Sequence, residues 1–182
     1  TSSYYVLDGK IYPAVKYDNL SDKEKQKAIK RSHMYIWMFG INDIVYYGRT
    51  WNELKLFLKR LDDHIGDTKY VFIHNLAFEF QYLKSYFKFS EVTARKSHKV
   101  MKAKMLDYNV ELRCSLMMSN VRLAKLPEIF NLPVEKMVGD LDYSLIRTPK
   151  TPLTEKELGY CEHDCLVVYY YIKMELDEYK DI

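Results

Sequence analysis

The sequence has few of the residues that interrupt or cross-link a chain. It has 182 residues, of which six are glycine, five proline and three cysteine, and no apolar run approaches the roughly 18 residues of a membrane-spanning helix. The cysteines are odd in number and are not spaced like a secreted disulfide framework. The N-terminal residues lack the charged and apolar regions of a signal peptide. We therefore expect a reduced, cytoplasmic chain with no membrane partner.

Positively charged residues slightly outnumber negatively charged ones. The formal net charge is +3, which does not by itself indicate a nucleic-acid partner. Five basic residues do concentrate between the two halves of the chain, namely Arg95, Lys96, Lys99, Lys102 and Lys104. They are either one solvated face of a β-hairpin or a ribbon that faces phosphates, and the sequence leaves both interpretations open.

Hydrophobic residues are abundant, at 48% of the chain, and favour one packed domain over residues 1–182. Hydrophobic periodicity predicts strands at 33–39, 44–47 and 69–73, helices at 50–66 and 76–87, three β stretches within 91–114, a short helix at 123–130 and a long helix from 154 toward 178. The first thirty residues are the least regular, with a turn at Asp8-Gly9 and a short polar helix from Ser21 to about Lys30. This order is typical of an α/β domain in which helices flank a mixed sheet, with an additional β-hairpin region.

Three helix starts carry the same signal. Ser21, Thr50 and Thr154 are each followed three residues later by glutamate. A hydroxyl and a carboxylate at this spacing can satisfy each other's free backbone N–H groups in a capping box. The sequence therefore predicts that a helix begins just after each of these residues.

Two polar pairs with a spacing of four residues are the strongest functional signal. Asn75 and Glu79 follow the apolar stretch 70–73, and Tyr160 and Asp164 lie near the start of the last helix. Residues i and i+4 share one helix face, and the carboxyl ends of core strands are where α/β sheets usually place their chemistry. Together the pairs suggest a metal-dependent nuclease.

These segments resemble motifs of family B DNA polymerases, in particular those of the protein-primed branch of phages and plasmids. Residues 71–79 (Val-Phe-Ile-His-Asn-Leu-Ala-Phe-Glu) resemble the second exonuclease motif, and residues 160–164 resemble the third, Tyr-x-x-x-Asp. Residues 139–143 are similar to a Gly-Asp-hydrophobic-Asp-Tyr segment of that branch, and residues 114–116 stand where it has a Ser-Leu pair. The resemblance covers roughly residues 33–175.

The resemblance implies a ribonuclease H-like fold and a proofreading 3′–5′ exonuclease that uses two Mg²⁺ or Mn²⁺ ions. Such a site needs carboxylates that converge on both ions, and these ions prefer oxygen ligands. The resemblance makes Asp164 and Glu79 metal ligands, with Glu79 in the place of the family's usual aspartate. It makes Tyr160 the residue that orients the attacking water.

The resemblance also implies a substrate, the 3′ end of single-stranded DNA. Asn75 and Phe78 would grip the terminal nucleotides, and Ser115, Leu116 and Tyr143 would line the groove for the strand. The polymerase domain of the same parent chain would be a further partner. The location would be the bacterial host cytoplasm for a phage-encoded protein.

The cation that would face the scissile phosphate is less clear. The family has a basic residue just before the segment 139–143, where this chain has Val138. Lys136, two residues earlier, is one candidate for this role, and Arg147 is the other.

One family motif is missing from the sequence. The first exonuclease motif is Asp-x-Glu followed by Thr on the first strand, and nothing in residues 1–30 has that form, since Asp8 is followed by Gly9 and reads as a turn. We therefore expect the chain to lack its first strand and two of four carboxylates. It would then be a poor nuclease: the intact site would hold two ions, whereas this chain could bind none.

Other interpretations stay open. A noncatalytic domain with this fold that binds nucleic acid or protein is the main alternative, and an RNA exonuclease is a weaker one. Asn75 alone is compatible with a helix cap, and each i,i+4 pair alone is compatible with an ordinary helix face. The set Cys161, His163 and Cys165 lacks a fourth ligand at the usual zinc spacing.

Overall fold

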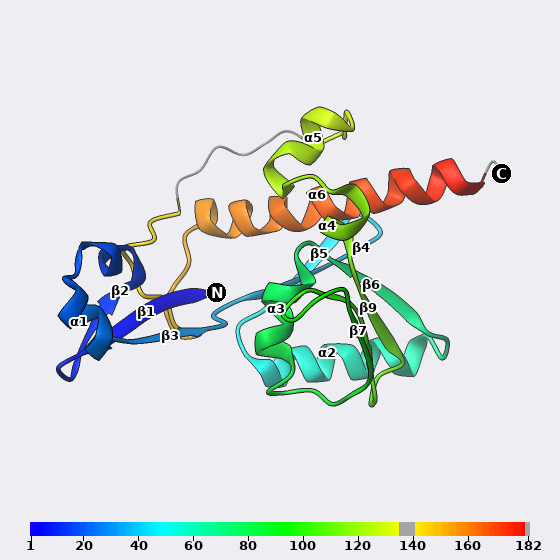
Figure 1. The fold of residues 1–182 in the computed structure, drawn as a ribbon. Helices are drawn as coiled ribbons and strands as arrows, with labels where there is room; N and C mark the ends of the chain where they lie inside the picture. Colours follow the sequence, from blue (N-terminus) through cyan, green and yellow to red (C-terminus); the bar gives the residue numbers. More distant parts are fainter. Residues whose placement is uncertain (135–140, 181–182) are drawn as a thin grey trace.

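The structure is a computed structural model that describes residues 1–134 and 141–180 (Figure 1). The strands are β1 (Ser2–Leu7), β2 (Lys10–Pro13), β3 (Ile29–His33), β4 (Trp37–Ile41), β5 (Ile44–Gly48), β6 (Lys69–Ile73), β7 (Phe89–Ala94), β8 (Val100–Met105) and β9 (Val110–Cys114). The helices are α1 (Asp22–Lys27), α2 (Trp51–His64), α3 (Leu76–Leu83), α4 (Ser115–Ser119), α5 (Leu126–Ile129) and α6 (Glu155–Lys180), with 3-10 turns η1 (Ala14–Asn19) and η2 (Leu123–Lys125). The strands form three sheets, ordered β2-β1-β3, β4-β5 and β6-β9-β8-β7.

The N-terminal region is more regular than the sequence predicts. The turn at Asp8-Gly9 is confirmed, with φ of 47° and 75°, and it joins the antiparallel strands β1 and β2. The capping box at Ser21 is also confirmed, but α1 ends at Lys27 and the predicted continuation to Lys30 is wrong. Residues 29–33 instead pair along β1 as β3, because a ladder of backbone hydrogen bonds to a neighbouring strand outweighs the weak helix preference of this polar segment.

The predicted hairpin is confirmed in β4 and β5, although its first strand is shorter than expected. The turn residues Asn42 and Asp43 have φ of 49° and 63°, the conformation that a two-residue hairpin connection requires. The expected strand from 33 to 39 is divided, because His33 ends β3 and β4 begins only at Trp37. The hairpin therefore forms a two-stranded sheet of its own.

The four-stranded sheet contains the predicted strand β6 with the expected bounds, but not in the expected place. An apolar strand that leads into the candidate residues is expected at the centre of its sheet, whereas β6 lies at the edge, parallel to β9 and with no other strand partner among the described residues. Strands β7, β8 and β9 follow the three predicted β stretches and are antiparallel to their neighbours. The helix α3 ends at Leu83 and not at Phe87, because Ser85 and Tyr86 donate hydrogen bonds three residues back and close tight turns.

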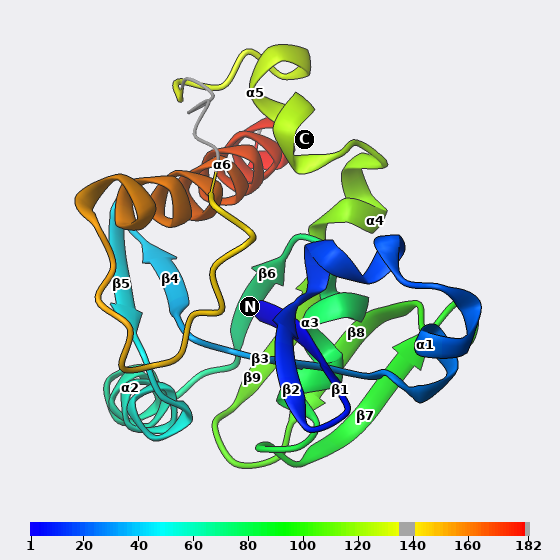
Figure 2. The ribbon, with the colours of Figure 1, turned by 90° about the vertical axis from the view of Figure 1, so that its left-hand side faces the viewer.

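Helices cover both faces of the hairpin and of β6. Figure 2 shows β4 and β5 between α6 on one side and α2 on the other. On the α2 side, Phe57 packs against Trp37 and Phe39 at ring-centroid distances of 5.4 and 5.1 Å. On the α6 side, a second apolar cluster joins Phe72 of β6 to Tyr171. The α6 helix therefore spans both sheets and holds them in one layered unit.

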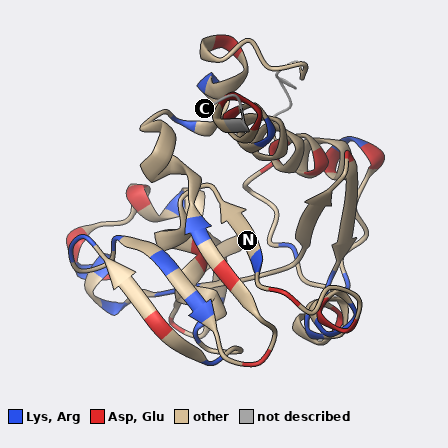
Figure 3. Cartoon of the chain, turned by 90° about the vertical axis from the view of Figure 1, so that its right-hand side faces the viewer, with Lys and Arg blue, Asp and Glu red and all other residues tan. Residues whose placement is uncertain are grey.

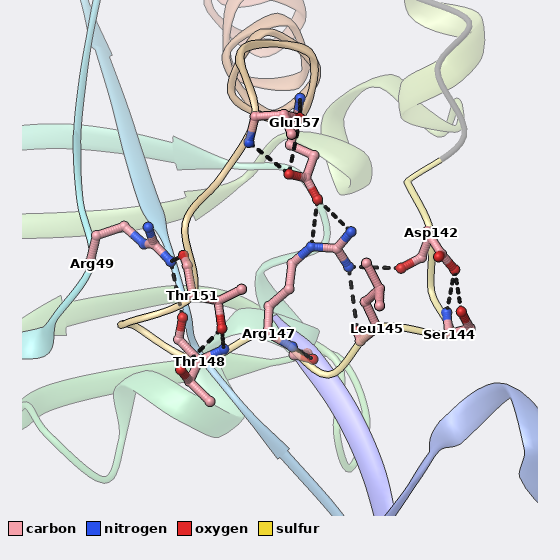
Figure 4. A network of polar contacts seen from close by, with 10 residues as sticks. Arg49, Asp142, Ser144, Leu145, Arg147, Thr148, Thr151 and Glu157 are labelled. Atoms are coloured by element: carbon pink, nitrogen blue, oxygen red, sulfur yellow. Dashed lines mark hydrogen bonds and ion pairs between the residues drawn. The ribbon is translucent and has the colours of Figure 1, made fainter.

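The start of α6 is fixed by a buried arginine (Figure 4). Arg147 is 3% exposed, and its guanidinium donates to the Glu157 carboxylate from Nη2 at 2.5 Å and from Nε at 2.8 Å. Glu157 also accepts from the backbone N–H of Thr154, while the Thr154 hydroxyl accepts from the backbone N–H of Glu157, which confirms the predicted capping box. The Arg147 backbone binds the Ser2 hydroxyl and the His33 ring, so the network ties α6 to β1 and β3.

The Arg147–Glu157 contact generates a stability prediction. Arg147→Ala should lower the free energy of unfolding by about 3–5 kcal/mol, because it leaves a largely buried carboxylate without its cation. Lys150→Ala removes an exposed charge from the same loop and should change it by no more than about 0.5 kcal/mol. Denaturant titration of the two variants measures the difference, and equal losses would contradict the buried pair.

Candidate functional site

The candidate residues gather where β6 ends and where α6 begins. Glu79 lies in the first turn of α3, directly after β6 and Asn75. Tyr160 and Asp164 lie one turn apart near the start of α6. The chain terminus Thr1 lies in the same region, beside α3 (Figure 2).

Asn75 occupies the junction between β6 and α3 in a left-handed conformation, with φ 65° and ψ 52°. Its exposed side chain makes no capping hydrogen bond within the described chain, so the interpretation of Asn75 as a side-chain cap is wrong. Non-glycine residues in this conformation are uncommon, and asparagine tolerates it best. The junction thus holds an exposed amide at the end of a core strand.

The carboxyl groups of Asp164 and Glu79 are both hard to ionise. Burial raises the pKa of Asp164 from 3.8 to about 6. Burial also raises the pKa of Glu79, and the positive charge of the Thr1 amino group partly opposes this. A bound cation favours the ionised form of such carboxylates, because its charge replaces the stabilisation that surrounding water gives an exposed carboxylate.

The Thr1 amino group interacts electrostatically with residues of both α3 and α6. Protein atoms surround the amino group, although Thr1 as a whole is exposed. This desolvation lowers the pKa of the amino group, and the charges of Glu79 and Cys161 partly offset it by raising that pKa. Burial, followed by the charge of Asp164, raises the pKa of the Cys161 thiol. Glu79 of α3 and Cys161 of α6 therefore both act electrostatically on the same amino group, and the charge of Asp164 acts in turn on Cys161. The expected convergence of the two carboxylates on one metal centre stays a prediction.

Two phenols adjoin these groups, the buried Tyr35 and the half-buried Tyr160. Burial, then the charge of Asp164 and the nearby Tyr143, raises the pKa of Tyr160 to about 12. Burial and the neighbouring Cys161 likewise raise the pKa of Tyr35 to about 12. Both phenols therefore stay protonated at neutral pH. Tyr35 carries no signal in the sequence, whereas Cys161 lies inside the motif and its residue type suggests only a zinc ligand there.

The predicted substrate residues differ in exposure. Phe78 and Tyr143 are 42% and 63% exposed, which excludes a core role for either, and Phe78 packs edge-on against Tyr82 at 5.5 Å. Leu116 is partly buried against the main core. Ser115 is fully buried and its hydroxyl lies 3.2 Å from His74 Nδ1, so any role of its side chain in DNA binding is indirect, through His74.

The two candidate cations have different outcomes. Lys136 lies outside the described residues, as do Gly139 and Asp140 of the adjoining segment. The alternative of Arg147 is wrong, because its guanidinium is buried and bound to Glu157 and to backbone carbonyls of the preceding loop. Sequence alone does not distinguish a buried arginine from a substrate-facing one.

The basic cluster is divided between two environments. Lys102 forms an ion pair with Glu111 on the four-stranded sheet, at 3.3 Å, and Figure 3 shows basic and acidic bands mixed on this sheet. Arg95, Lys96 and Lys99 instead line a hollow of about 430 Å³ beside α4. The interpretation as a solvated, charge-paired face therefore fits Lys102, and the phosphate-facing one stays open for the three residues of the hollow.

The described residues do not supply a complete site for two metal ions. Carboxylates of Glu79 and Asp164 are suitable oxygen donors for Mg²⁺ or Mn²⁺, but nowhere in residues 1–134 and 141–180 do three or more His, Cys, Asp or Glu side chains form a group able to hold an ion. The cysteine and histidine set of α6 is excluded as a zinc site by the same observation. Nor does this part of the chain contain a helix long and apolar enough to cross a membrane.

Comparison with known proteins identifies the fold. No protein-family model and no curated protein sequence matches the chain. Solved structures do match. One is phage phi29 DNA polymerase complexed with single-stranded DNA, with a TM-score of 0.64 and 14% identity over a match that covers 97% of this chain and 31% of that chain. The chain folds like part of a protein-primed family B DNA polymerase.

Two further phi29 polymerase structures agree. The ternary complex with primer-template DNA and incoming nucleotides gives a TM-score of 0.62 at 15% identity over 75% of this chain, and the post-translocation binary complex gives 0.58 at 17% over 74%. The chain spans 26% of each of those chains. The α/β fold class and the resemblance expected from the sequence are thereby confirmed at the level of fold.

The raised pKa of Asp164 generates a pH prediction. The native residue keeps its proton up to about pH 6, whereas the unfolded residue loses it near 3.8, so this group makes stability fall as the pH rises from about 4 to 6. Asp164→Asn should therefore raise the melting temperature at pH 7.5 by a few degrees and leave it nearly unchanged at pH 4.

Thermal melts across this pH range measure the effect, with Glu162→Gln on the exposed side of α6 as the control. The control should shift the melting temperature little at any pH. If Asp164→Asn shifts the melting temperature by the same amount at both pH values, the raised pKa assigned to Asp164 is contradicted.

Proposed function

We propose that this chain is a 3′–5′ exonuclease domain of a family B DNA polymerase, acting on the 3′ end of single-stranded DNA. The observation that carries the proposal is that Glu79 of α3 and Cys161 of the Tyr160–Asp164 segment both act electrostatically on the Thr1 amino group and raise its pKa. These residues belong to a chain that folds like part of phi29 DNA polymerase. The motif resemblance of the same residues assigns their roles.

The chain's own residues have suitable chemistry for these roles. Phosphodiester hydrolysis needs an oriented water and stabilisation of the negative charge on the leaving 3′ oxygen, and bound divalent ions supply much of that stabilisation. Tyr160 stays protonated at neutral pH and can hold a water by donating and accepting hydrogen bonds. Asn75 and Phe78 project from the same junction and offer an amide and an exposed ring for the terminal nucleotide.

Catalysis by the 182 residues alone should be weak. Glu79 and Asp164 provide two carboxylates, and no group of three possible ligands occurs in the described portion. The main alternative, a noncatalytic domain that binds nucleic acid, is favoured by this same shortage. The two functions differ in whether added carboxylates restore cleavage.

Adding carboxylates next to Thr1 tests the catalytic proposal. An Asp-x-Glu segment fused in front of Thr1 should raise Mg²⁺-dependent degradation of a single-stranded oligonucleotide by about 100-fold or more, because it adds two charged ligands beside Glu79 and Asp164. A matched Asn-x-Gln extension should leave the rate at its low starting value. Gel analysis of a 5′-labelled oligonucleotide measures the rate and the direction of degradation.

Two results would contradict this account. One is full activity of the 182-residue chain, which would leave the exonuclease function in place but show that the metal centre lies elsewhere. The other is no gain from the Asp-x-Glu extension while oligonucleotide binding persists, which would favour the noncatalytic binding domain.

Phe78 tests the substrate grip. Phe78→Ala should weaken binding of a short single-stranded oligonucleotide by roughly tenfold, since a base–aromatic stack contributes about 1–3 kcal/mol, while the melting temperature changes little because the ring is exposed. Tyr47→Ala removes a ring of similar exposure on β5 and should leave binding unchanged. Fluorescence anisotropy and thermal melts distinguish this from a folding defect, and equal binding by both variants would place the strand elsewhere.

A further inference from the structure

The hollow of about 430 Å³ lies at the turn between β7 and β8. Arg95, Lys96 and Lys99 line it from that turn. Met117 of α4 and Asn120, the residue that follows α4, line it from the other side. The lining therefore holds three cations, an amide and a thioether, and the described residues contribute no carboxylate to it.

The β7–β8 turn holds the three cations close together. The backbone N–H of Lys99 donates to the carbonyl of Lys96 at 3.0 Å, and the backbone N–H of Arg95 donates to the carbonyl of Lys99 at 3.1 Å. Like charges held this close repel each other. Lys102, further along β8, is instead neutralised by Glu111. An anion in the hollow would remove the repulsion that remains at the turn.

The polar groups of the hollow suit phosphate oxygens. A guanidinium binds phosphate through paired N–H groups, and lysine binds it as a point charge. The exposed side chain of Asn120 adds an amide that can donate. Met117 is 36% exposed and offers an apolar contact that a free phosphate cannot use. A nucleotide chain, with phosphates beside apolar base faces, uses both kinds of group.

The hollow and the candidate site share one edge of the four-stranded sheet. Strands β6 and β9 end in register at Ile73 and Cys114. Strand β8 begins at the same edge and β7 ends there, because each is antiparallel to its neighbour. The junction at Asn75 therefore lies at one end of this edge, and the β7–β8 turn lies at the other.

The short helix α4 connects the two ends. His74 directly precedes Asn75, and its Nδ1 lies 3.2 Å from the hydroxyl of Ser115, the first residue of α4. Met117 lies in the same helix and faces the hollow. One helix therefore contacts both the junction and the hollow.

The separation of the two ends corresponds to a few nucleotides. The strand order is β6-β9-β8-β7, and neighbouring strands lie about 4.8 Å apart, so the ends are about 14 Å from each other. A strand with bases stacked as in a duplex advances about 3.4 Å per nucleotide. The hollow is thus about four nucleotides from a base that stacks on Phe78.

We infer that the hollow lined by Arg95, Lys96 and Lys99 is a phosphate-binding site for the backbone of a single strand, about four nucleotides from its 3′ end. The identity of the strand rests on the proposed function. The phosphate chemistry of the hollow does not, because it needs neither the carboxylates nor bound metal ions.

Removal of the three charges tests the inference. The triple variant Arg95→Ala, Lys96→Ala and Lys99→Ala should weaken binding of an oligonucleotide of about twelve nucleotides by roughly tenfold or more at low salt. The slope of log affinity against log salt concentration should become shallower by about 2, because each lost phosphate contact removes about 0.7 from it. Fluorescence anisotropy over a salt series measures both quantities.

Oligonucleotide length provides an internal control. An oligonucleotide of about three nucleotides reaches Phe78 but not the hollow, so the alanine triple variant and the native chain should bind it equally in an NMR titration. The charge-conserving triple variant Arg95→Lys, Lys96→Arg and Lys99→Arg should keep the salt slope for the longer oligonucleotide.

A second triple variant controls for net charge. Lys10→Ala, Lys16→Ala and Lys23→Ala remove three exposed lysines of the N-terminal region, and should change the affinity and the salt slope little. The lysines and arginines replaced in all three variants are exposed, and thermal melts check that each variant folds like the native chain.

Three outcomes would overturn the inference. In the first, the alanine triple variant at the hollow binds the longer oligonucleotide like the native chain while Phe78→Ala weakens binding, which removes the hollow and keeps the proposed function. In the second, the N-terminal triple variant weakens binding equally, which makes the effect one of net charge. In the third, inorganic phosphate at constant ionic strength binds the hollow as tightly as the longer oligonucleotide does, which makes it a site for the free anion.

The converse result separates the two proposals. If the alanine triple variant weakens binding of the longer oligonucleotide while Phe78→Ala does not, the hollow is retained as a site for the strand and the grip on the 3′ end is rejected.

Discussion

The ion pair between Arg147 and Glu157 is the constraint on which the arrangement of the candidate site depends. Glu157 caps α6 and at the same time binds the buried guanidinium of Arg147. The backbone of Arg147 is in turn held by Ser2 of β1 and His33 of β3. One carboxylate thus sets both the first turn of α6 and its position against the N-terminal sheet. Tyr160 and Asp164 follow within the next two turns, so their position against Glu79 depends on this contact.

The candidate site also contains a largely buried carboxyl group, Asp164, but burial there reduces stability. Arg147 neutralises Glu157, whereas Asp164 has no described cation that lowers its pKa, and burial alone raises that pKa. A group held in this state reduces stability at neutral pH. Such a cost is common at sites that bind a charged ligand, and a divalent ion or the end of a nucleic acid with its ion is a ligand of that kind.

Local signals in the sequence predicted local structure well. The capping boxes at Ser21, Thr50 and Thr154 form as expected, because each depends only on residues within one turn. The arrangement of distant segments was not predictable in the same way. The pairing of residues 29–33 with β1, the edge position of β6 and the burial of Arg147 depend on tertiary neighbours. For the site, spacing identified the two helix faces and the family resemblance pointed to the exposed Phe78, but neither identified Tyr35 or the burial of Ser115.

The central claim is that Glu79 and Asp164 form one cation site, and paramagnetic Mn²⁺ tests it most directly. Trace Mn²⁺ added to the labelled chain should broaden the backbone amide signals of Glu79 and of Asp164 together, at the same low concentration, even where the metal binds weakly. Asp164→Asn should then reduce the broadening at Glu79 as well. Broadening at only one of the two residues, or first at exposed acidic residues such as Asp63, would contradict a shared site.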